Sequence, residues 1–570
     1  DRAKDLDISE RDLKADSIIL CSFGDASANH ATALSAFNTA SWVSNSGGHV
    51  PIIFICEDNG TGISVPTNEH WIEQNFSNRP RLQYVQTDGL HLIDLMIKSR
   101  RVEHDCRIDR SPIFLHMKTV RLMGHAGSDV EVGYKSLQDI EATEFNDPLL
   151  HSARILIENN CLSSEEIIHL YEGIGDQVSH VFEAATLRPK LESAQDVMES
   201  ITANQSSKKS PKQPTKKTRQ NLFGKEFNRM DQPYHMAKLI NYTLSDIMLR
   251  YKNTVVFGED VAQKGGVYHL TADLYKQFGV RRVFNSPLDE TSIIGFGMGF
   301  GHNGFVPIPE IQFLAYLHNA EDQLRGEAAT LPFFSDGQFT NPMVLRVPGL
   351  AYQKGFGGHF HNDNSLTIFR DIPGIILAVP SNGADASKMI RTAVREAHEN
   401  GRIIVFVEPI ALYMTKDLHE PKDGKWTFKY PVLDEEIPVG KFAEYGKGKV
   451  LTLITYGNGL YLSLQAKKEI EKKLKKKIKI IDLRWLSEMN IPKLLNAIGT
   501  SNNILIVDEC RRTGCHGEGL LSQLVSESKK PLNIKLHAAE DSFISIGVAA
   551  TVTLPSKDSI IKNALELVNG

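Results

Sequence analysis

The chain has 570 residues, of which 41% are hydrophobic and 23% are charged, with a formal net charge of −5. A charge this small gives no basis for binding nucleic acid or a membrane surface, and no apolar run reaches the length of a transmembrane helix. The length predicts about three domains. The six cysteines lack metal-ligand spacing, which favours a reducing cytoplasm.

Residues 1–200 alternate apolar runs with helical patterns. The runs over 18–23, 51–56 and 113–117 have the continuous apolar character of strands that are buried on both faces. Strands of this kind separated by helices predict a parallel sheet covered by helices. The first part of the chain is therefore expected to be a doubly wound α/β domain.

The first run ends at Gly24 and Asp25, and small residues follow over 31–36. This order predicts a strand, a tight turn and a helix N-terminus, whose backbone N–H groups suit a diphosphate. Asp25 and Asn59 follow neighbouring strands and offer the hard oxygens that magnesium prefers. A Gly-Asp pair alone is more often an ordinary turn, but with Asn59 it predicts a magnesium-diphosphate site.

Together, these two strand ends resemble the thiamine diphosphate motif, Gly-Asp-Gly, a helix and Asn-Asn, of thiamine-dependent enzymes. The resemblance implies metal ligands at Asp25, Asn59 and the backbone carbonyl of Thr61. The implied cofactor contacts in this region are Gly24, Asp25, Ala26, Ser27, Asn59, Thr61 and Gly62. The chain departs from the motif at Ala26 and Asp58, and its spacing is longer than the family usually shows.

The loop after the third strand contains Arg121, His125 and Asp129. By composition alone it is a polar surface turn with a titratable imidazole. Its pattern, Arg-x-x-Gly-His-x-x-Ser-Asp, resembles the active-site loop of the alpha subunit of 2-oxoacid dehydrogenase decarboxylase components. The resemblance implies a catalytic role for His125 and a cofactor contact for Arg121. Ala126 stands where mitochondrial members carry a regulatory phosphoserine, so phosphorylation at that position is excluded.

Residues 201–229 differ in composition from the segments on either side. The stretch 205–217 is basic, contains prolines and has almost no apolar residues. Such a segment cannot bury enough surface to order itself, so the sequence predicts a flexible linker that is disordered over 205–217. A nucleic-acid-binding tail is disfavoured because no aromatic residues are interleaved with the lysines.

Two predicted strands in the next part of the chain, over 254–257 and 282–285, are followed by carboxylates. The first leads to Glu259 and Asp260, which suit a capped turn as well as a site. The second leads to Glu290, directly before a glycine-rich helix, where an unpaired charge is costly. Glu290 resembles the invariant glutamate of thiamine enzymes, which implies a carboxyl that hydrogen-bonds the pyrimidine ring from an apolar, pKa-shifting pocket.

The stretch 309–316 resembles the beta-subunit segment that flanks the aminopyrimidine. This resemblance implies cofactor contacts from Gln312 and Tyr316, and the separate resemblance of 258–262 to the same component implies one from Glu259.

A glycine-rich segment, 357–365, resembles the histidine loop of the same subunit. On residues alone, His359 and His361 are equal candidates. The register of the following stretch, 369–374, places His361 on the catalytic histidine of that family.

The last part of the chain resembles the transketolase C-terminal domain. The expected fold is therefore α/β, with two doubly wound parallel-sheet domains of the thiamine diphosphate-binding fold and a third α/β domain. The expected boundaries are 1–200 for the diphosphate-binding domain, 201–229 for the linker, 230–430 for the pyrimidine-binding domain and 431–570 for the transketolase C-terminal-like domain.

Taken together, the chain resembles the decarboxylase (first) component of 2-oxoacid dehydrogenase complexes, with alpha and beta portions fused. This implies thiamine diphosphate and Mg²⁺, a 2-oxoacid substrate, and acyl transfer to the lipoyl domain of a dihydrolipoyl acyltransferase. The branched-chain 2-oxoacid 2-oxoisovalerate is the expected substrate, and a homodimer the expected assembly. The alternatives are a pyruvate or acetoin dehydrogenase component, a transketolase-like transferase and a non-catalytic assembly module.

Asp1 stands only a few residues before the first site strand. For the family that the chain resembles, this start is late, because an opening segment normally supplies further diphosphate contacts. We expect that segment to be truncated or to be provided by another chain, and its absence motivates the assembly-module alternative.

Overall fold

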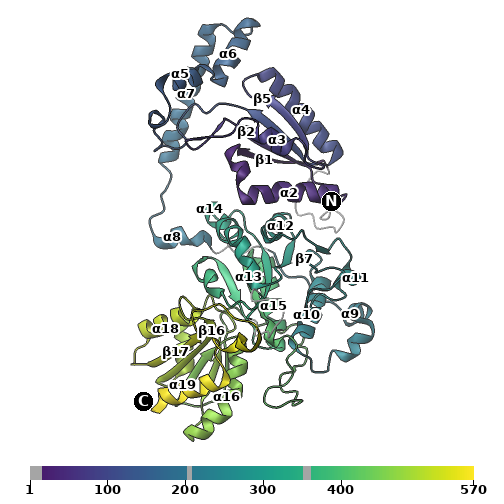
Figure 1. The fold of residues 1–570 in the computed structure, drawn as a ribbon, viewed down its shortest axis with the longest axis vertical. Coiled ribbons are helices and arrows are strands. Elements are labelled where there is room, and N and C mark those ends of the chain that lie inside the picture. Colours follow the sequence, from purple (N-terminus) through teal and green to yellow (C-terminus); the bar gives the residue numbers. More distant parts are fainter. Residues whose placement is uncertain (1–15, 202–207, 351–360, 570) are drawn as a thin grey trace. The chain divides into compact units, whose positions relative to one another are not determined.

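The computed structural model describes residues 16–201, 208–350 and 361–569. The chain forms two compact units, an N-terminal unit over Asp12–Glu192 and a C-terminal unit that includes Ser193–Gly570 (Figure 1). Within the described ranges, no helix is both long and apolar enough to cross a membrane.

The N-terminal unit contains a four-stranded parallel sheet in the order β1-β2-β6-β5. Its strands are β1 (Ile19–Gly24), β2 (Ile52–Asp58), β5 (Gln83–Asp88) and β6 (Ile113–Lys118), with a hairpin of β3 (Thr61–Gly62) and β4 (Val65–Pro66). Its helices are α2 (Ala31–Asn45), α3 (Trp71–Phe76), α4 (Leu92–Asp109), α5 (Leu137–Phe145), α6 (Pro148–Glu158) and α7 (Ser164–Thr186). The three strands expected from apolar runs are confirmed, but the expected burial is wrong for β1, an edge strand in which Ile19 and Leu20 are 60% and 64% exposed.

Helices cover both faces of this sheet. On one face, Phe37 of α2 and Phe76 of α3 pack on Phe54 and Phe114 in the strands, with ring centroids 4.9 Å apart for Phe37–Phe54 and 4.2 Å for Phe76–Phe114. On the other face, Val102 of α4 lies in the cluster formed by the opposite side chains of β2 and β6. Each such buried side chain stabilises the fold by about 1.5–3 kcal/mol. The packing holds the ends of β1 and β2 side by side.

The C-terminal unit contains two sheets. The first has six parallel strands in the order β11-β12-β10-β9-β7-β8: β7 (Thr254–Gly258), β8 (Val283–Asn285), β9 (Val306–Glu310), β10 (Met343–Gly349), β11 (Ile375–Ala378) and β12 (Ile403–Pro409). The second has the order β13-β15-β14-β16-β17, with only β13 antiparallel: β13 (Ala443–Tyr445), β14 (Thr452–Thr455), β15 (Lys479–Asp482), β16 (Asn503–Arg511) and β17 (Asn533–Ala539).

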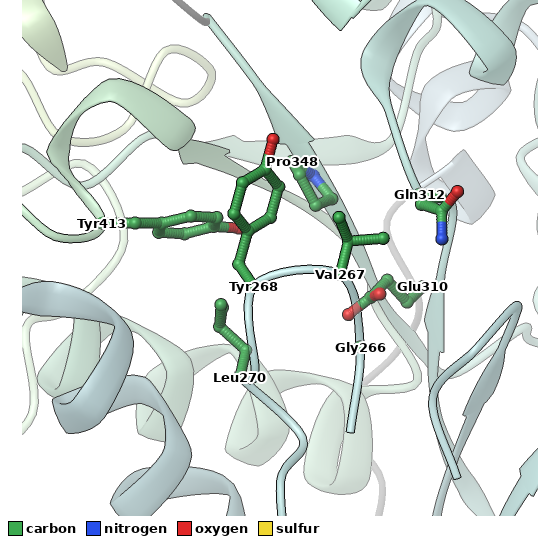
Figure 2. Close-up of a pocket in the computed structure, with 8 residues that line it drawn as sticks. All are labelled: Gly266, Val267, Tyr268, Leu270, Glu310, Gln312, Pro348 and Tyr413. Atoms are coloured by element: carbon green, nitrogen blue, oxygen red, sulfur yellow. The ribbon is translucent and has the colours of Figure 1, made fainter. Parts of the chain in front are cut away.

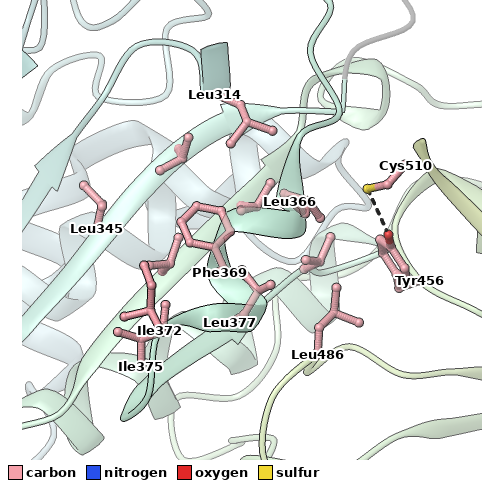
Figure 3. Close-up of a cluster of buried hydrophobic side chains, with 14 of the residues drawn as sticks. Leu314, Leu345, Leu366, Phe369, Ile372, Ile375, Leu377, Tyr456, Leu486 and Cys510 are labelled. Carbon is pink, nitrogen blue, oxygen red and sulfur yellow. Dashed lines mark hydrogen bonds between the residues drawn. The ribbon is translucent and has the colours of Figure 1, made fainter. Parts of the chain in front are cut away.

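Helices precede, separate and follow the strands of the C-terminal unit. They are α8 (Ala194–Met198), α9 (Lys216–Phe223), α10 (Met236–Arg250), α11 (Leu274–Phe278), α12 (Glu290–His302), α13 (Leu314–Leu317), α14 (Leu331–Phe334), α15 (Gly383–Asn400), α16 (Asn458–Leu474), α17 (Ile491–Ile498), α18 (His516–Glu527) and α19 (Lys557–Asn569). The two sheets share one apolar cluster. Figure 3 shows Leu345 and Leu377 of the six-stranded sheet together with Tyr456 and Leu486 from the other side.

The segment expected to be a flexible linker differs from that expectation over 208–229. Ser210 donates to Glu399 from its backbone N–H (2.9 Å) and its hydroxyl (2.6 Å), and Gln213 donates to the carbonyl of Leu433 (3.1 Å). Helix α9 begins within it, at Lys216. The expected disorder is therefore wrong for 208–217, because polar groups far away in the sequence, one side chain and one backbone carbonyl, supply the partners that local composition lacks.

Candidate active site

The ends of β1 and β2 carry the residues of the predicted diphosphate site. Gly24 pairs in register with Glu57, so Asp25 and Asn59 follow neighbouring strand ends. Asp25 is only 2% exposed, and its Oδ2 accepts a hydrogen bond of 2.5 Å from the Thr67 hydroxyl. The Asn59 Oδ1 accepts one of 3.0 Å from the backbone N–H of Thr61.

A close approach joins the two strand ends. A Cβ on Gly62 would lie 2.5 Å from the Cβ of Ala26, closer than real Cβ contacts. Ala26 begins a short 3₁₀ helix, Ala26–Asn29, which includes Ser27 and precedes α2. The structure therefore brings all the residues predicted for the diphosphate site to one edge of the sheet: Gly24, Asp25, Ala26, Ser27, Asn59, Thr61 and Gly62. Their roles stay predictions.

Sequence reasoning missed a buried polar network beside this edge. Oδ2 of Asp58 lies 2.7 Å from Nε2 of His116 and 2.5 Å from Nζ of Lys118, and Nδ1 of His116 lies 2.5 Å from the Tyr84 hydroxyl. Burial opposes ionisation of Asp58, but the hydrogen bonds from His116 and Lys118 hold its pKa below the ordinary value. Asp58 stands where the motif has its first Asn, and the positive charge of Lys118 compensates the negative charge of this carboxylate. The unusual Asp58 was the only signal in the sequence.

The predicted histidine loop is organised by a tyrosine that the sequence did not single out. Tyr134 donates to Oδ2 of Asp129 (2.7 Å) and accepts from Nη2 of Arg121 (2.9 Å). The same Asp129 oxygen accepts the backbone N–H of His125 at 2.7 Å. These hydrogen bonds, the one from Tyr134 first, lower the pKa of Asp129. The imidazole of His125 is exposed, so the loop presents it to solvent on a fixed backbone.

In the C-terminal unit, the ends of β7, β8 and β9 meet, because Gly258 pairs with both Asn285 and Glu310. Glu259 follows directly and is 8% exposed. Its buried Oε1 has no hydrogen-bond partner among the described residues. Burial, and then the charge of Glu290, raises the pKa of Glu259 to about 7. This carboxyl is poised to exchange a proton near neutral pH.

Glu290 is the first residue of α12 and is half-buried. Its Oε2 accepts a hydrogen bond of 3.3 Å from the side-chain amide of Asn319. The apolar pocket expected around Glu290 is not formed by the described residues of its own unit, because this end of the helix is partly open to solvent. Glu259 has the more buried carboxyl of the two.

The remaining predicted residues of this unit are Gln312, Tyr316 and His361. Nε2 of Gln312 donates to Oδ2 of Asp260 at 3.4 Å. Nε2 of His361 lies 3.3 Å from the Tyr316 hydroxyl, and its ring centroid lies 4.1 Å from that of Phe313. The rival, His359, lies outside the described residues.

A fully buried arginine supports this strand edge. Arg346 of β10 is 0% exposed, binds both oxygens of Glu408 (2.7 and 2.9 Å) and binds Glu310 (2.7 Å). Figure 2 shows Glu310, Gln312 and Tyr413 around a small pocket of about 10 Å³, which is close to the volume that one water needs. A lone arginine in an otherwise apolar strand was the sequence signal for this ion cluster.

Comparisons with known proteins agree with this layout. The family described as “Dehydrogenase E1 component” matches residues 3–194, “Transketolase, pyrimidine binding domain” matches 232–414, and “Transketolase, C-terminal domain” matches 440–543. The “Pyruvate dehydrogenase E1 component subunit beta” of Staphylococcus epidermidis is 31% identical over 338 residues, 58% of this chain and 97% of the relative. The protein of the same description from Bacillus subtilis (strain 168) is 30% identical over 346 residues, 58% of this chain and 98% of the relative.

A solved structure described as “Split gene transketolase, inactive beta4 tetramer” superposes with a TM-score of 0.46 and 14% identity, over 59% of this chain and 99% of that one. The fold of the present chain is the transketolase-like α/β fold with parallel sheets and a transketolase C-terminal domain. The chain belongs to the dehydrogenase E1 component family, with an alpha-like and a beta-like part in one chain.

Proposed function

We propose that the chain decarboxylates a 2-oxoacid with thiamine diphosphate and passes the acyl group to the lipoyl domain of a dihydrolipoyl acyltransferase. The observation that carries the proposal is the cluster of polar side chains at the ends of β7, β8 and β9. There, a buried carboxyl with a raised pKa, Glu259, lies among further carboxylates. Family membership supports the same class of reaction.

The described residues fit this cofactor in both units. Asp25, Asn59 and the carbonyl of Thr61 supply oxygens for Mg²⁺, and Gly62 leaves space beside Ala26 where a side chain would clash. The orphaned Oε1 of Glu259 is a hydrogen-bond acceptor in need of a donor. Further diphosphate contacts come from Gly24, Ser27 and Arg121, and pyrimidine contacts from Gln312 and Tyr316.

When bound, thiamine diphosphate supplies the nucleophilic carbon and holds the electron pair left as carbon dioxide departs. Glu290 would hydrogen-bond the pyrimidine and share a proton with its ring nitrogen. His125 and His361 hold or release protons at their ring nitrogens, and Tyr316 orients Nε2 of His361. The proposal requires the diphosphate residues of an N-terminal unit and the pyrimidine residues of a C-terminal unit to bind the same cofactor. We therefore propose a homodimer with two sites.

The choice of 2-oxoacid is a separate part of the proposal. The sequence led us to branched-chain 2-oxoisovalerate, whereas the relatives' descriptions name pyruvate. Carbon dioxide release should be measured from 2-oxoisovalerate, pyruvate and 2-oxoglutarate side by side, with the cofactor, Mg²⁺ and a lipoyl-domain acceptor. A higher kcat/KM for pyruvate would overturn the branched-chain assignment and leave the reaction class standing.

Two results would overturn the reaction class itself. Ketol transfer between sugar phosphates without any response to the lipoyl acceptor would assign the chain to the transketolase-like transferases. Absence of magnesium-dependent thiamine diphosphate binding in calorimetry would assign it to non-catalytic assembly modules. The matched variant is Glu290→Gln, which we expect to bind the cofactor but to lose decarboxylation.

A further inference from the structure

A cavity of about 560 Å³ lies between the six-stranded and the five-stranded sheet of the C-terminal unit, away from the candidate active site. Its size is within the range of small-molecule sites. The apolar wall belongs to the cluster of Figure 3 and consists of Phe369, Ile372, Ile375, Leu377 and Leu486. The lining also includes polar side chains, those of Arg370, Ser487, Glu488, His516 and Gln523. A cavity with one apolar wall and a few polar groups is what an amphipathic ligand needs.

His516 gives the first sign of a missing partner. It is the first residue of α18, it lines the cavity and it is 7% exposed. Its Nδ1 is buried and has no hydrogen-bond partner among the described residues. A buried polar atom without a partner is destabilising, and a ligand in the cavity would satisfy it.

Arg370 gives the second, independent sign. Its Nη1 donates to the carbonyls of Gly514 and Cys515, the latter at 2.8 Å, which fixes the side chain on the loop before α18. A Cβ on Gly519 would lie 2.6 Å from Nη2 of Arg370. The guanidinium therefore packs against α18 at a position where only a glycine leaves enough space. Within the described ranges, Nε and Nη2 of Arg370 have no acceptor. These N–H groups belong to an exposed side chain and are accessible to solvent and to a ligand.

The charged groups around the cavity favour an anionic ligand. Glu488 also lines the cavity, but it forms an ion pair with Arg402, which offsets its charge. The positive end of α18 adds to the field of Arg370. Burial, and then Arg370, lowers the pKa of His516 to about 3, so its imidazole is neutral and one ring nitrogen carries a proton to donate.

We propose that this cavity binds a small carboxylate with an apolar body. The carboxylate accepts hydrogen bonds from Arg370 and from a ring N–H of His516, and the body lies against the wall that contains Phe369 and Leu486. This assignment is independent of the proposed reaction, because none of these residues belongs to the candidate active site.

The test is calorimetric titration of the full chain with 2-naphthoate as the probe and 2-naphthalenemethanol as its uncharged counterpart. We expect saturable binding of one 2-naphthoate per chain and about tenfold weaker binding of the alcohol, a difference of about 1.4 kcal/mol. His516→Phe and Arg370→Gln should each weaken 2-naphthoate binding by about tenfold or more. The matched control, Arg512→Gln, changes an exposed arginine that does not line the cavity and should leave the affinity unchanged.

Thermal melts must show that the variants are folded. If either site variant fails to fold, Gln523→Trp, at an exposed position on α18 that lines the cavity, replaces it and should block binding by filling the space. The proposal is overturned if 2-naphthoate does not saturate, if the alcohol binds equally well, or if the folded site variants bind as the control does. Loss of decarboxylation with intact 2-naphthoate binding would sink only the proposed function.

Discussion

Replacing Glu259 by glutamine tests the electrostatics at the ends of β7, β8 and β9. Glu259 is 8% exposed, and burial followed by the charge of Glu290 raises its pKa from 4.5 to about 7. A carboxyl with a raised pKa in the folded state binds its proton more tightly there than in the unfolded chain. Its contribution is fully present below about pH 4.5 and is lost as the pH rises through about 7.

The magnitude follows from the two pKa values. At roughly 1.36 kcal/mol per pKa unit they correspond to about 3 kcal/mol in total, of which about 2.5 kcal/mol is lost between pH 5 and pH 8. For a unit of roughly 380 residues, an unfolding entropy of about 2.1 cal/mol/K per residue converts this into about 3 °C in Tm.

The assay is scanning calorimetry of the full chain without cofactor at pH 5 and pH 8. We expect the Tm of the wild type to fall by about 3 °C more than that of Glu259→Gln over this interval. Glu527→Gln is the matched control, because Glu527 is exposed at the end of α18 and should melt in parallel with the wild type. A constant difference in Tm between the wild type and Glu259→Gln at both pH values would refute the reasoning.

Three further outcomes are expected. Arg346→Met leaves two buried carboxylates without their partner and should lower the free energy of unfolding in urea by about 3–5 kcal/mol; a loss below about 1 kcal/mol would contradict the buried ion cluster. Gly62→Ala places a Cβ 2.5 Å from that of Ala26 and should weaken thiamine diphosphate binding in calorimetry by about tenfold or more, with unchanged affinity as the contrary result. Asp25→Asn should make cofactor binding insensitive to Mg²⁺, and a retained magnesium dependence would remove Asp25 from the metal ligands.

Local pattern was enough to predict the elements that carry the diphosphate site. Strands β2 and β6 are continuous apolar runs because they lie inside a parallel sheet whose faces are covered by helices. Strand β1 is also an apolar run, although it lies at the edge of the sheet and is largely exposed. The polar residues Asp25 and Asn59 interrupt those runs where the strands end, which is a signal that a sequence contains by itself. Strand β5, at the other edge of the sheet, has only Tyr84 and Val85 as apolar residues among polar ones, so it has no long apolar run to reveal it.

Tertiary structure decided the features that depend on partners distant in the sequence. His116 reaches Asp58 across neighbouring strands, and Ser210 in the expected linker is held by Glu399 of a later helix. The raised pKa of Glu259 is likewise the combined effect of burial and of carboxylates from several strand ends. Composition and periodicity report how a segment buries its own side chains, whereas hydrogen-bond partners, desolvation and neighbouring charge are set by packing, and packing exists only once the chain has folded.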